Sequence, residues 1–308
     1  MLKSGISVVI LSWNTKDITD KCLSCLKKAM DFVKDRADVE VIVIDNASND
    51  GSGEMIAKKH PWVRLFKMKK NLGYARGNNF GFKKGDPRNN YLLIINSDVY
   101  VKEKTFFSAL TYLEKNPTCD AIGCRLYYED GRFQPSAGYL PTPKSVWSWI
   151  WGLDKLPIIK NFFLPVHPTE RNFFVNDRQV GWVMGAFLFM KREVFEETHG
   201  FDENFFMYMD EVEWCRRVQE SGYKICYTPS FSVTHLDKAS AQGDPQKLTN
   251  IYRLEILGIV YFLRKHYKRQ AKLLTLVVKT GVFFRFLAFT FLGNKIRRDA
   301  YLQALREL

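Results

Sequence analysis

Cysteine and histidine are scarce in this chain of 308 residues, which contains 6 Cys and 5 His. The one CxxC pair, Cys22 and Cys25, is joined by no second pair and no paired histidines, so a Cys/His metal cage is not expected. So few cysteines in a chain of this length also exclude a small disulfide scaffold. We expect the reduced thiols of a cytosolic protein.

Two N-terminal signatures are absent as well. The apolar run at 6–11 is too short for the core of a secretory signal, and the polar residues Ser12, Trp13 and Asn14 follow it at once. The run therefore predicts a first buried strand. No GxGxxG follows that strand, where the chain reads SWNTKD, and this disfavours a dinucleotide-binding Rossmann domain.

Acidic residues are outnumbered, and the imbalance lies at one end of the chain. The sequence has 46 Lys and Arg against 33 Asp and Glu, a net charge of +13. Residues 251–308 hold 12 basic and 3 acidic residues, or +9, which leaves +4 for the first 250. A near-neutral body with a basic apolar tail predicts attachment to an anionic surface. A nucleic-acid partner is not expected, because such proteins more often spread or groove their charge.

Short apolar runs alternate with amphipathic stretches through the first hundred residues. The runs are rich in β-branched and aliphatic residues, as in strands covered on both faces. They span 6–11, 39–44, 63–68 and 91–95, and the helical stretches between them span about 17–34, 52–59 and 74–84. This alternation predicts right-handed βαβ units and a mostly parallel sheet, whose ligand lies beyond the carboxyl ends of the strands.

A polar loop follows each of the four predicted strands, and all four loops should meet at one edge of the sheet. Turns use the same residue types, so one loop alone is explained equally well by turn chemistry. All four together favour a diphosphate ligand with its metal. The loops are Ser12-Trp13-Asn14, DNASNDGS at 45–52, NLGYARGNN at 71–79 and Asn96-Ser97-Asp98.

The pattern changes in the second half of the chain. Residues 119–139 indicate short strands and turns, and residues 140–180 are rich in proline and aromatic side chains. Regular secondary structure is predicted again further on, with a helix at about 210–221 and a strand at 224–228. Two or three helices follow to the end of the sequence.

Several of these segments resemble a known family. VVILSWN, VIVIDNASNDGS, NLGYARGNN and INSDV resemble the nucleotide-sugar half of a family 2 glycosyltransferase, and 181–192 and 200–216 resemble acceptor-side segments of its bacterial rhamnosyltransferase-like branch. The resemblance implies an α/β GT-A fold with a Rossmann-like, mostly parallel sheet wound with helices. The GT-A domain would occupy residues 1–238, with a donor half at about 1–100 and an acceptor half at about 101–238. Residues 239–308 would add a C-terminal extension of basic amphipathic helices.

The resemblance also implies a divalent cation, Mg²⁺ or Mn²⁺, at the departing diphosphate. The family's Asp-x-Asp motif reads Asn96-Ser97-Asp98 here, so Asp98 is the carboxylate left to bind the metal. Because the first carboxylate of the motif is missing, the affinity of the site for the metal is in question. His235 matches a position where the family often has a histidine near the metal, although a lone histidine after a strand is more often structural.

A donor-binding set follows from the same resemblance. Asp45 would accept a hydrogen bond from the pyrimidine or ribose, and Arg76 would face the nucleotide or the phosphates, unless it is simply a solvated cation at the start of a helix. The full set is Ser12, Trp13, Asn14, Asp45, Asn46, Asn71, Gly73, Arg76, Asn78 and Ser97.

The catalytic base should be a carboxylate on the acceptor side. The family usually reads Glu-Asp and uses the second acid, whereas this chain reads Asp210-Glu211, so position favours Glu211 with Asp210 as the alternative. Helical spacing prevents Asp210, Glu211 and Glu213 from all pointing one way. The acidic run could also simply charge a helix N-terminus. One base and no sign of a covalent intermediate predict inversion at the anomeric carbon.

The acceptor would contact Trp182, Gly185, Ala186 and Trp147. Trp147 belongs to the aromatic segment, for which acceptor binding, membrane contact and packing on the domain all remain open.

The tail segment LLTLVVKTGVFFRFLAFTFL at 273–292 is nearly long enough to cross a bilayer, but Lys279 and Arg285 lie within it. Their insertion cost roughly cancels the apolar gain. We therefore expect the tail to lie in the membrane interface. The alternative is packing on the domain or on a second subunit, and an oligomer is compatible with the sequence.

Together these features predict an inverting glycosyltransferase that moves a sugar, such as rhamnose or another deoxyhexose, from a nucleoside-diphosphate donor to a glycan or lipid-linked acceptor during cell-surface polysaccharide synthesis. It would be cytoplasmic and peripherally attached to the inner face of the cell membrane. The alternative is a catalytically silent nucleotide-binding or membrane scaffold protein of the same fold, suggested by Asn96 and the Asp-Glu order. Retention of Asp98, Glu211 and His235 together argues against it.

Overall fold

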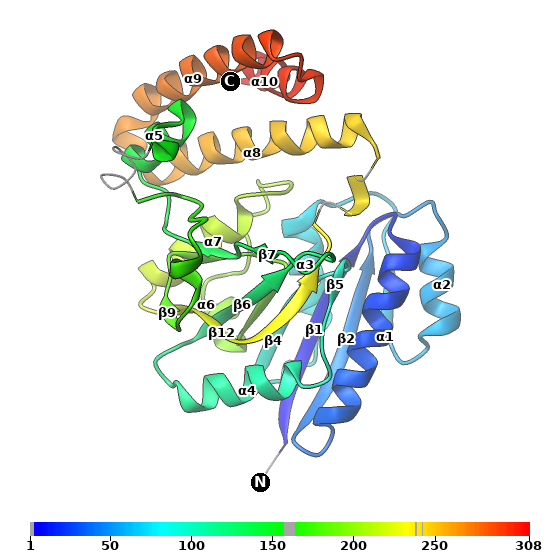
Figure 1. The fold of residues 1–308 in the computed structure, drawn as a ribbon. Helices are drawn as coiled ribbons and strands as arrows, with labels where there is room; N and C mark the ends of the chain where they lie inside the picture. Colours follow the sequence, from blue (N-terminus) through cyan, green and yellow to red (C-terminus); the bar gives the residue numbers. More distant parts are fainter. Residues whose placement is uncertain (1–2, 157–163, 238, 242) are drawn as a thin grey trace.

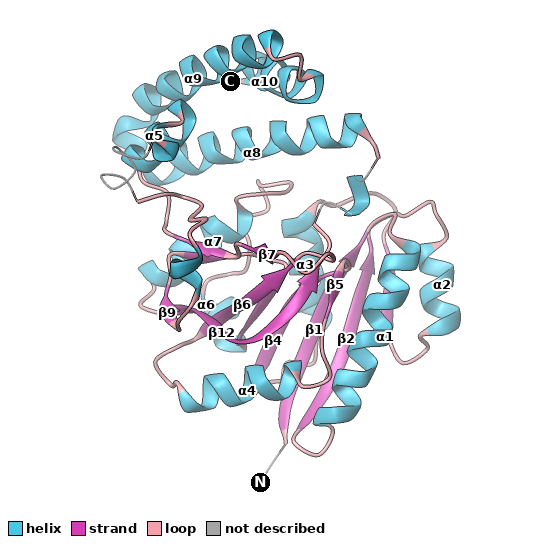
Figure 2. Ribbon diagram, in the orientation of Figure 1, coloured by secondary structure: helices cyan, strands magenta, loops and turns pink. Residues whose placement is uncertain are grey.

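A ten-stranded sheet with helices on both faces forms the centre of the computed structural model, which describes residues 3–156, 164–237, 239–241 and 243–308 (Figures 1 and 2). The main path of the sheet runs β3-β2-β1-β4-β11-β6-β12-β5. Strands β3, β2, β1 and β4 are parallel, which confirms the predicted βαβ winding. Their carboxyl ends therefore meet at one edge of the sheet.

The N-terminal half follows the predicted order of elements. Its strands and helices are β1 Ser4–Ser12, α1 Lys16–Val33, β2 Ala37–Asp45, α2 Ser52–Lys59, β3 Arg64–Lys67, α3 Tyr74–Lys84 and β4 Tyr91–Asn96. Successive residues of the central strands enter two different cores: Val9 and Ile94 face one side, and Val8 and Leu93 the other. This alternation explains why the runs are apolar throughout rather than at every second residue.

The second half inserts an antiparallel strand into the sheet. Strand β11, Phe187–Lys191, pairs antiparallel with both β4 and β6, and β6 is parallel to β12. The other elements of this half are β5 Val99–Tyr100, α4 Thr105–Lys115, β6 Ala121–Tyr127, β7 Phe133–Gln134, β8 Ala137–Gly138, α5 Pro143–Trp151, β9 Arg178–Gln179, β10 Trp182–Val183, α6 Arg192–Glu197, α7 Asp210–Glu220 and β12 Ile225–His235.

Part of the aromatic segment is helical. Helix α5 begins at a capping box, in which Thr142 and Ser145 each accept a hydrogen bond from the other's backbone N–H. Residues 157–163 of the same segment lie outside the described residues.

The expectation of reduced thiols throughout is wrong for one pair. Cys119 and Cys226 form a disulfide across 107 residues of sequence, while Cys22, Cys25, Cys124 and Cys215 are free. Cys119 lies just before β6 and Cys226 lies on β12, so the parallel pairing of these two strands brings the sulfur atoms together.

Three C-terminal helices lie beyond the carboxyl edge of the sheet: α8 Pro245–His266, α9 Ala271–Phe291 and α10 Lys295–Glu307. Helix α8 places Ile259 and Phe262 in the same apolar core as Met209 and Trp214 near the start of α7. It therefore packs into the body of the protein. The predicted boundary at 238 falls on a residue outside the described ranges.

Candidate active site

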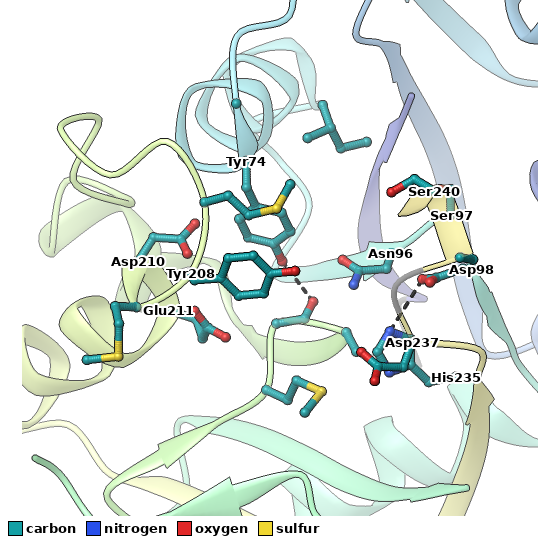
Figure 3. A pocket seen from close by; sticks show the side chains of 18 of the residues that line it. Tyr74, Asn96, Ser97, Asp98, Tyr208, Asp210, Glu211, His235, Asp237 and Ser240 are labelled. Atoms are coloured by element: carbon teal, nitrogen blue, oxygen red, sulfur yellow. Dashed lines mark hydrogen bonds and ion pairs between the residues drawn. The ribbon is translucent and has the colours of Figure 1, made fainter. Parts of the chain in front are cut away.

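A cleft of about 290 Å³ opens at the carboxyl ends of β1 and β4, between the sheet, the start of α7 and the middle of α8, and Figure 3 shows side chains that line it. Twelve of the residues predicted for the site line it. They are Trp13, Asn46, Asn71, Gly73, Ser97, Asp98, Trp182, Gly185, Ala186, Asp210, Glu211 and His235. The structure thus brings together the donor, metal, base and acceptor candidates.

The predicted donor side of the cleft contains two amide side chains that cross-link neighbouring loops. Asn46 Nδ2 donates to Asn71 Oδ1 at 2.8 Å, and Asn46 Oδ1 accepts from the Leu72 N–H, also at 2.8 Å. The next residue, Gly73, has φ +79°, and a Cβ there would lie 2.5 Å from the Phe206 carbonyl oxygen. Glycine at 73 therefore lets the donor loop approach the segment that leads into α7.

Six predicted residues do not line the cleft, and three of them stabilise the loops around it. Ser12 is buried against Thr15 and Thr19. Asn14 joins the first two loops through the Asn49 N–H, and Asp45 accepts from the Ser48 N–H. Arg76 pairs with Glu203 at 3.4 Å on the surface. Asn78 is buried on α3, and Trp147, 42% exposed, lies on α5.

Asp98 and His235 adjoin one another at the predicted metal position. Asp98 Oδ1 lies 3.4 Å from His235 Nε2, and both side chains are largely buried. On its other side the imidazole meets Gln134, with Nδ1 3.1 Å from Oε1. Since Gln134 Oε1 can only accept, Nδ1 donates in this bond, and Nε2 is the ring nitrogen that faces Asp98.

This pair fits a divalent cation. A histidine that donates through one ring nitrogen and offers the other is the usual arrangement of a metal ligand, and a carboxylate oxygen completes a donor pair suited to Mn²⁺ or Mg²⁺. Among the described residues, no group of three or more His, Cys, Asp or Glu gathers to hold a metal. The remaining ligands would have to come from the donor diphosphate and water.

Asp210 and Glu211 open α7 on the opposite side of the cleft from Asp98 and His235 (Figure 3). Burial raises the pKa of Asp210 well above its ordinary value, and the charge of Glu211 raises it further. Burial also raises the pKa of Glu211, but backbone amides of α7 and of Gly185 offset part of the rise. The pair therefore loses its first proton at Glu211, while Asp210 stays protonated.

Glu213 points elsewhere, as helical spacing predicted. Its carboxylate is fully buried and contacts two cationic side chains, Arg217 at 2.9 Å and Lys265 at 2.6 Å, and the imidazole of His266 at 3.2 Å. Lys265 also pairs with Asp202 at 2.7 Å. Burial alone would raise the pKa of Glu213, but the His266 hydrogen bond and the charges of Arg217 and Lys265 hold it below its ordinary value. These contacts join the end of α8 to the helix that carries Asp210 and Glu211.

We expect Glu213→Gln to lower the free energy of unfolding by about 3 kcal/mol at pH 7, because it leaves partly buried cations without their partner. Because the folded-state pKa of Glu213 is lowered, its carboxylate contributes fully to stability above the unfolded-state pKa of about 4.3. That contribution is lost as the pH falls through the lower folded-state pKa. Urea unfolding should therefore show a smaller difference in the free energy of unfolding between the wild type and Glu213→Gln at pH 3.5 than at pH 7. The matched control is Glu220→Gln, which removes an exposed ion pair on the same helix and should change stability by less than about 1 kcal/mol. A difference that persists unchanged at low pH would contradict the assignment.

The sequence did not point to several cleft residues. Tyr74 donates its hydroxyl to the Gly185 carbonyl at 2.8 Å, and a Cβ at 185 would lie 2.4 Å from that hydroxyl, so glycine is needed there. Tyr208, like Met209, has a left-handed backbone with φ +67°, and its ring enters the cleft (Figure 3). No periodicity marks such positions. The other unpredicted lining residues include Thr15, His167, Met184, Met207, Asp237, Ser240 and Glu255.

The fold is that of a GT-A glycosyltransferase. A solved structure of the mannosyltransferase PcManGT from Pyrobaculum calidifontis, in complex with GDP-Man and Mn²⁺, superposes with a TM-score of 0.57 over 99% of this chain and 87% of that one, at 15% identity. The structure of S. aureus TarS 1-349 gives a TM-score of 0.52 over 99% and 90%, at 12% identity. At these identities the likeness concerns the fold.

The chain belongs to glycosyltransferase family 2, whose model matches residues 7–199. It is 28% identical over 230 residues, 67% of this chain and 69% of the relative, to the N-acetylglucosaminyl-diphospho-decaprenol L-rhamnosyltransferase of Mycobacterium tuberculosis. Over 151 residues, 47% of this chain and 52% of the relative, it is 23% identical to the Escherichia coli rhamnosyltransferase WbbL. The predicted resemblance to the rhamnosyltransferase-like branch is confirmed.

Proposed function

We propose that this protein is an inverting glycosyltransferase that moves a sugar from a nucleoside-diphosphate donor to a glycan or lipid-linked acceptor in the synthesis of a cell-surface polysaccharide. The observation that carries the proposal is the pairing, in one cleft, of Asp98 and His235 at the sheet edge with the buried carboxylates of α7. The first pair suits a charged diphosphate, and the second suits an acceptor hydroxyl.

Each side of the cleft has its own task in this reaction. Asn46, Asn71 and Ser97 present polar groups to the donor, and Asp98 and His235 would hold the divalent cation. When bound, the cation would neutralise the charge that develops on the departing diphosphate. Glu211 takes the proton of the acceptor hydroxyl as that oxygen attacks the anomeric carbon. Asp210, which is protonated, adds no second negative charge beside the base, and a single displacement inverts the carbon.

The relatives suggest the substrates. Both the M. tuberculosis and the E. coli relatives are named as rhamnosyltransferases, which supports rhamnose or another deoxyhexose as the transferred sugar. The first is also named for a sugar attached through diphosphate to decaprenol, a lipid. A lipid-linked acceptor would place this enzyme at the inner face of the cell membrane, and we propose that it attaches there peripherally.

The test is a panel of thymidine-, uridine- and guanosine-diphosphate sugars, offered to the full-length protein with and without Mn²⁺. We expect one class to raise the midpoint of thermal unfolding in the presence of Mn²⁺, and to release its nucleoside diphosphate once a suitable acceptor is added. The anomeric configuration of the product, read by NMR, should be inverted. Stabilisation by a nucleotide sugar with no turnover on any acceptor would favour the scaffold alternative.

A further inference from the structure

Helix α9 presents an apolar stripe to the outside of the molecule. Its large exposed apolar side chains are separated by three, seven, one and seven residues, which places them on one side of the helix, and they are between 46% and 89% exposed. They are Leu273, Leu276, Phe283, Phe284 and Phe291. Segment 268–291 is long and apolar enough to cross a membrane, and only 17% of its apolar 18-residue window is buried. Exposed apolar surface of this extent indicates an interaction site.

Two tryptophans of α5 extend the stripe into a broader face. Trp147 and Trp151 are four residues apart, so they lie on the same side of the helix, and they are 42% and 39% exposed. The Trp151 ring centroid lies 5.4 Å from that of Phe284. The aromatic segment and the tail, more than 120 residues apart, therefore form one surface, which we call the α5–α9 face.

The opposite side of α9 is packed on the protein. Leu274, Val278 and Val282 are buried, and a Cβ at Gly281 would lie 2.6 Å from Ile150 of α5. The Arg285 guanidinium donates to the Ile150 carbonyl at 2.8 Å, to the Trp149 carbonyl and to the Tyr301 hydroxyl at 3.0 Å. The helix could cross a bilayer only by giving up these contacts, so its position fits a helix that lies along a surface.

The charge around the face is of one sign. Lys268 and Arg269 lie in a 3₁₀ turn just before α9, Lys272 lies in the first turn of α9, Lys279 lies within the stripe, and Lys295 follows the end of the helix, all of them exposed. The sequence has no Asp or Glu between Glu255 and Asp299. If a second copy of the chain docked on this face, the lysines and arginines of the two copies would repel each other. Anionic lipid head groups would complement them.

We propose that the α5–α9 face lies flat on a bilayer containing anionic lipid, with α9 parallel to the membrane plane. The exposed Leu and Phe side chains enter the acyl boundary, Trp147 and Trp151 sit at the level of the head groups, and the lysines contact lipid phosphates. The proposal refines the peripheral attachment suggested above. It can be tested independently of glycosyl transfer, because vesicle binding needs neither donor nor acceptor.

The experiment is co-sedimentation of the full-length protein with vesicles of phosphatidylcholine alone or with 30% phosphatidylglycerol. We expect the wild type to bind the anionic vesicles at least tenfold more tightly, with binding weakened by salt. Leu276→Ser/Phe284→Ser should lower the affinity for anionic vesicles at least tenfold. The matched control is Phe32→Ser/Phe107→Ser, which changes two comparably exposed apolar residues on α1 and α4 and should bind as the wild type does.

A second variant, Lys272→Glu/Lys279→Glu, alters only exposed lysines, so it tests the proposal even if Leu276→Ser/Phe284→Ser misfolds. It should also lose tenfold in affinity while keeping the thermal midpoint of the wild type. Equal binding by the wild type and both variants would overturn the proposal. So would a change from dimer to monomer in the variants without a change in vesicle binding. Resistance of the membrane-bound protein to alkaline carbonate would likewise overturn it, since that would indicate a spanning helix.

Discussion

Glu211→Gln should lower the rate of glycosyl transfer by about 10²–10⁴-fold while donor binding is kept. The amide has nearly the shape of the carboxylate but cannot take a proton, and general-base catalysis typically contributes a factor of this size. Turnover is measured as release of nucleoside diphosphate, and donor binding by calorimetry in the presence of Mn²⁺. Turnover within a few fold of the wild type would exclude Glu211 as the base.

Asp210→Asn is the matched control for this variant. Since Asp210 holds a proton beside Glu211, a neutral amide replaces a neutral acid, and we expect a much smaller loss of rate. The raised pKa of Glu211 also predicts that the rate increases with pH over a limb centred above the ordinary glutamate value of about 4.3, as the base loses its proton. If Asp210→Asn abolished transfer and Glu211→Gln did not, the two roles would be exchanged.

Asp98→Asn should reduce Mn²⁺-dependent binding of the donor by about 100-fold or more. Charge stabilisation by a bound cation amounts to several kcal/mol, and each 1.4 kcal/mol is a factor of ten in affinity. The loss should be seen as a calorimetric dissociation constant that no longer responds to Mn²⁺. His235→Ala should show a smaller loss in the same direction, because a carboxylate ligand remains.

Asp237→Asn serves as the control for Asp98. Asp237 also lines the cleft and follows β12, two residues after His235, whereas Asp98 is the predicted metal ligand at 3.4 Å from the imidazole. We expect the response to Mn²⁺ to survive this change. A loss of that response in Asp237→Asn, with Asp98→Asn unaffected, would move the metal site to the other carboxylate.

The donor side of the cleft could be predicted because it depends on local pattern. Alternating apolar runs and amphipathic stretches specify parallel strands, and parallel strands place the residues that follow them at one edge. Asn46, Asn71 and Asp98 were therefore expected together before any contact was known. The predicted site also included Ser12 and Asp45, which support the walls, because sequence position cannot tell which side chains of a loop face the cavity.

Other features depend on long-range packing and left no local signal. Tyr208 enters the cleft through a left-handed backbone that the surrounding contacts impose, and Glu255 lines it from α8. The charge of Arg285 disfavours insertion of the tail segment across a membrane. In the structure its guanidinium bonds to carbonyl groups of α5, 135 residues earlier in the chain. The disulfide between Cys119 and Cys226 likewise depends on strand pairing, which the spacing of the cysteines does not reveal.

Helix α8 lies between the sheet and α9 (Figure 1), and its residue Glu255 lines the cleft. Packed helix axes are about 8–10 Å apart, so two helical layers hold the cleft roughly 15–20 Å from a bilayer that contacts the α5–α9 face. The two helices would then act as a spacer that selects acceptors by length. A lipid whose sugar projects on a diphosphate could reach the cleft, whereas a hydroxyl held at head-group level could not.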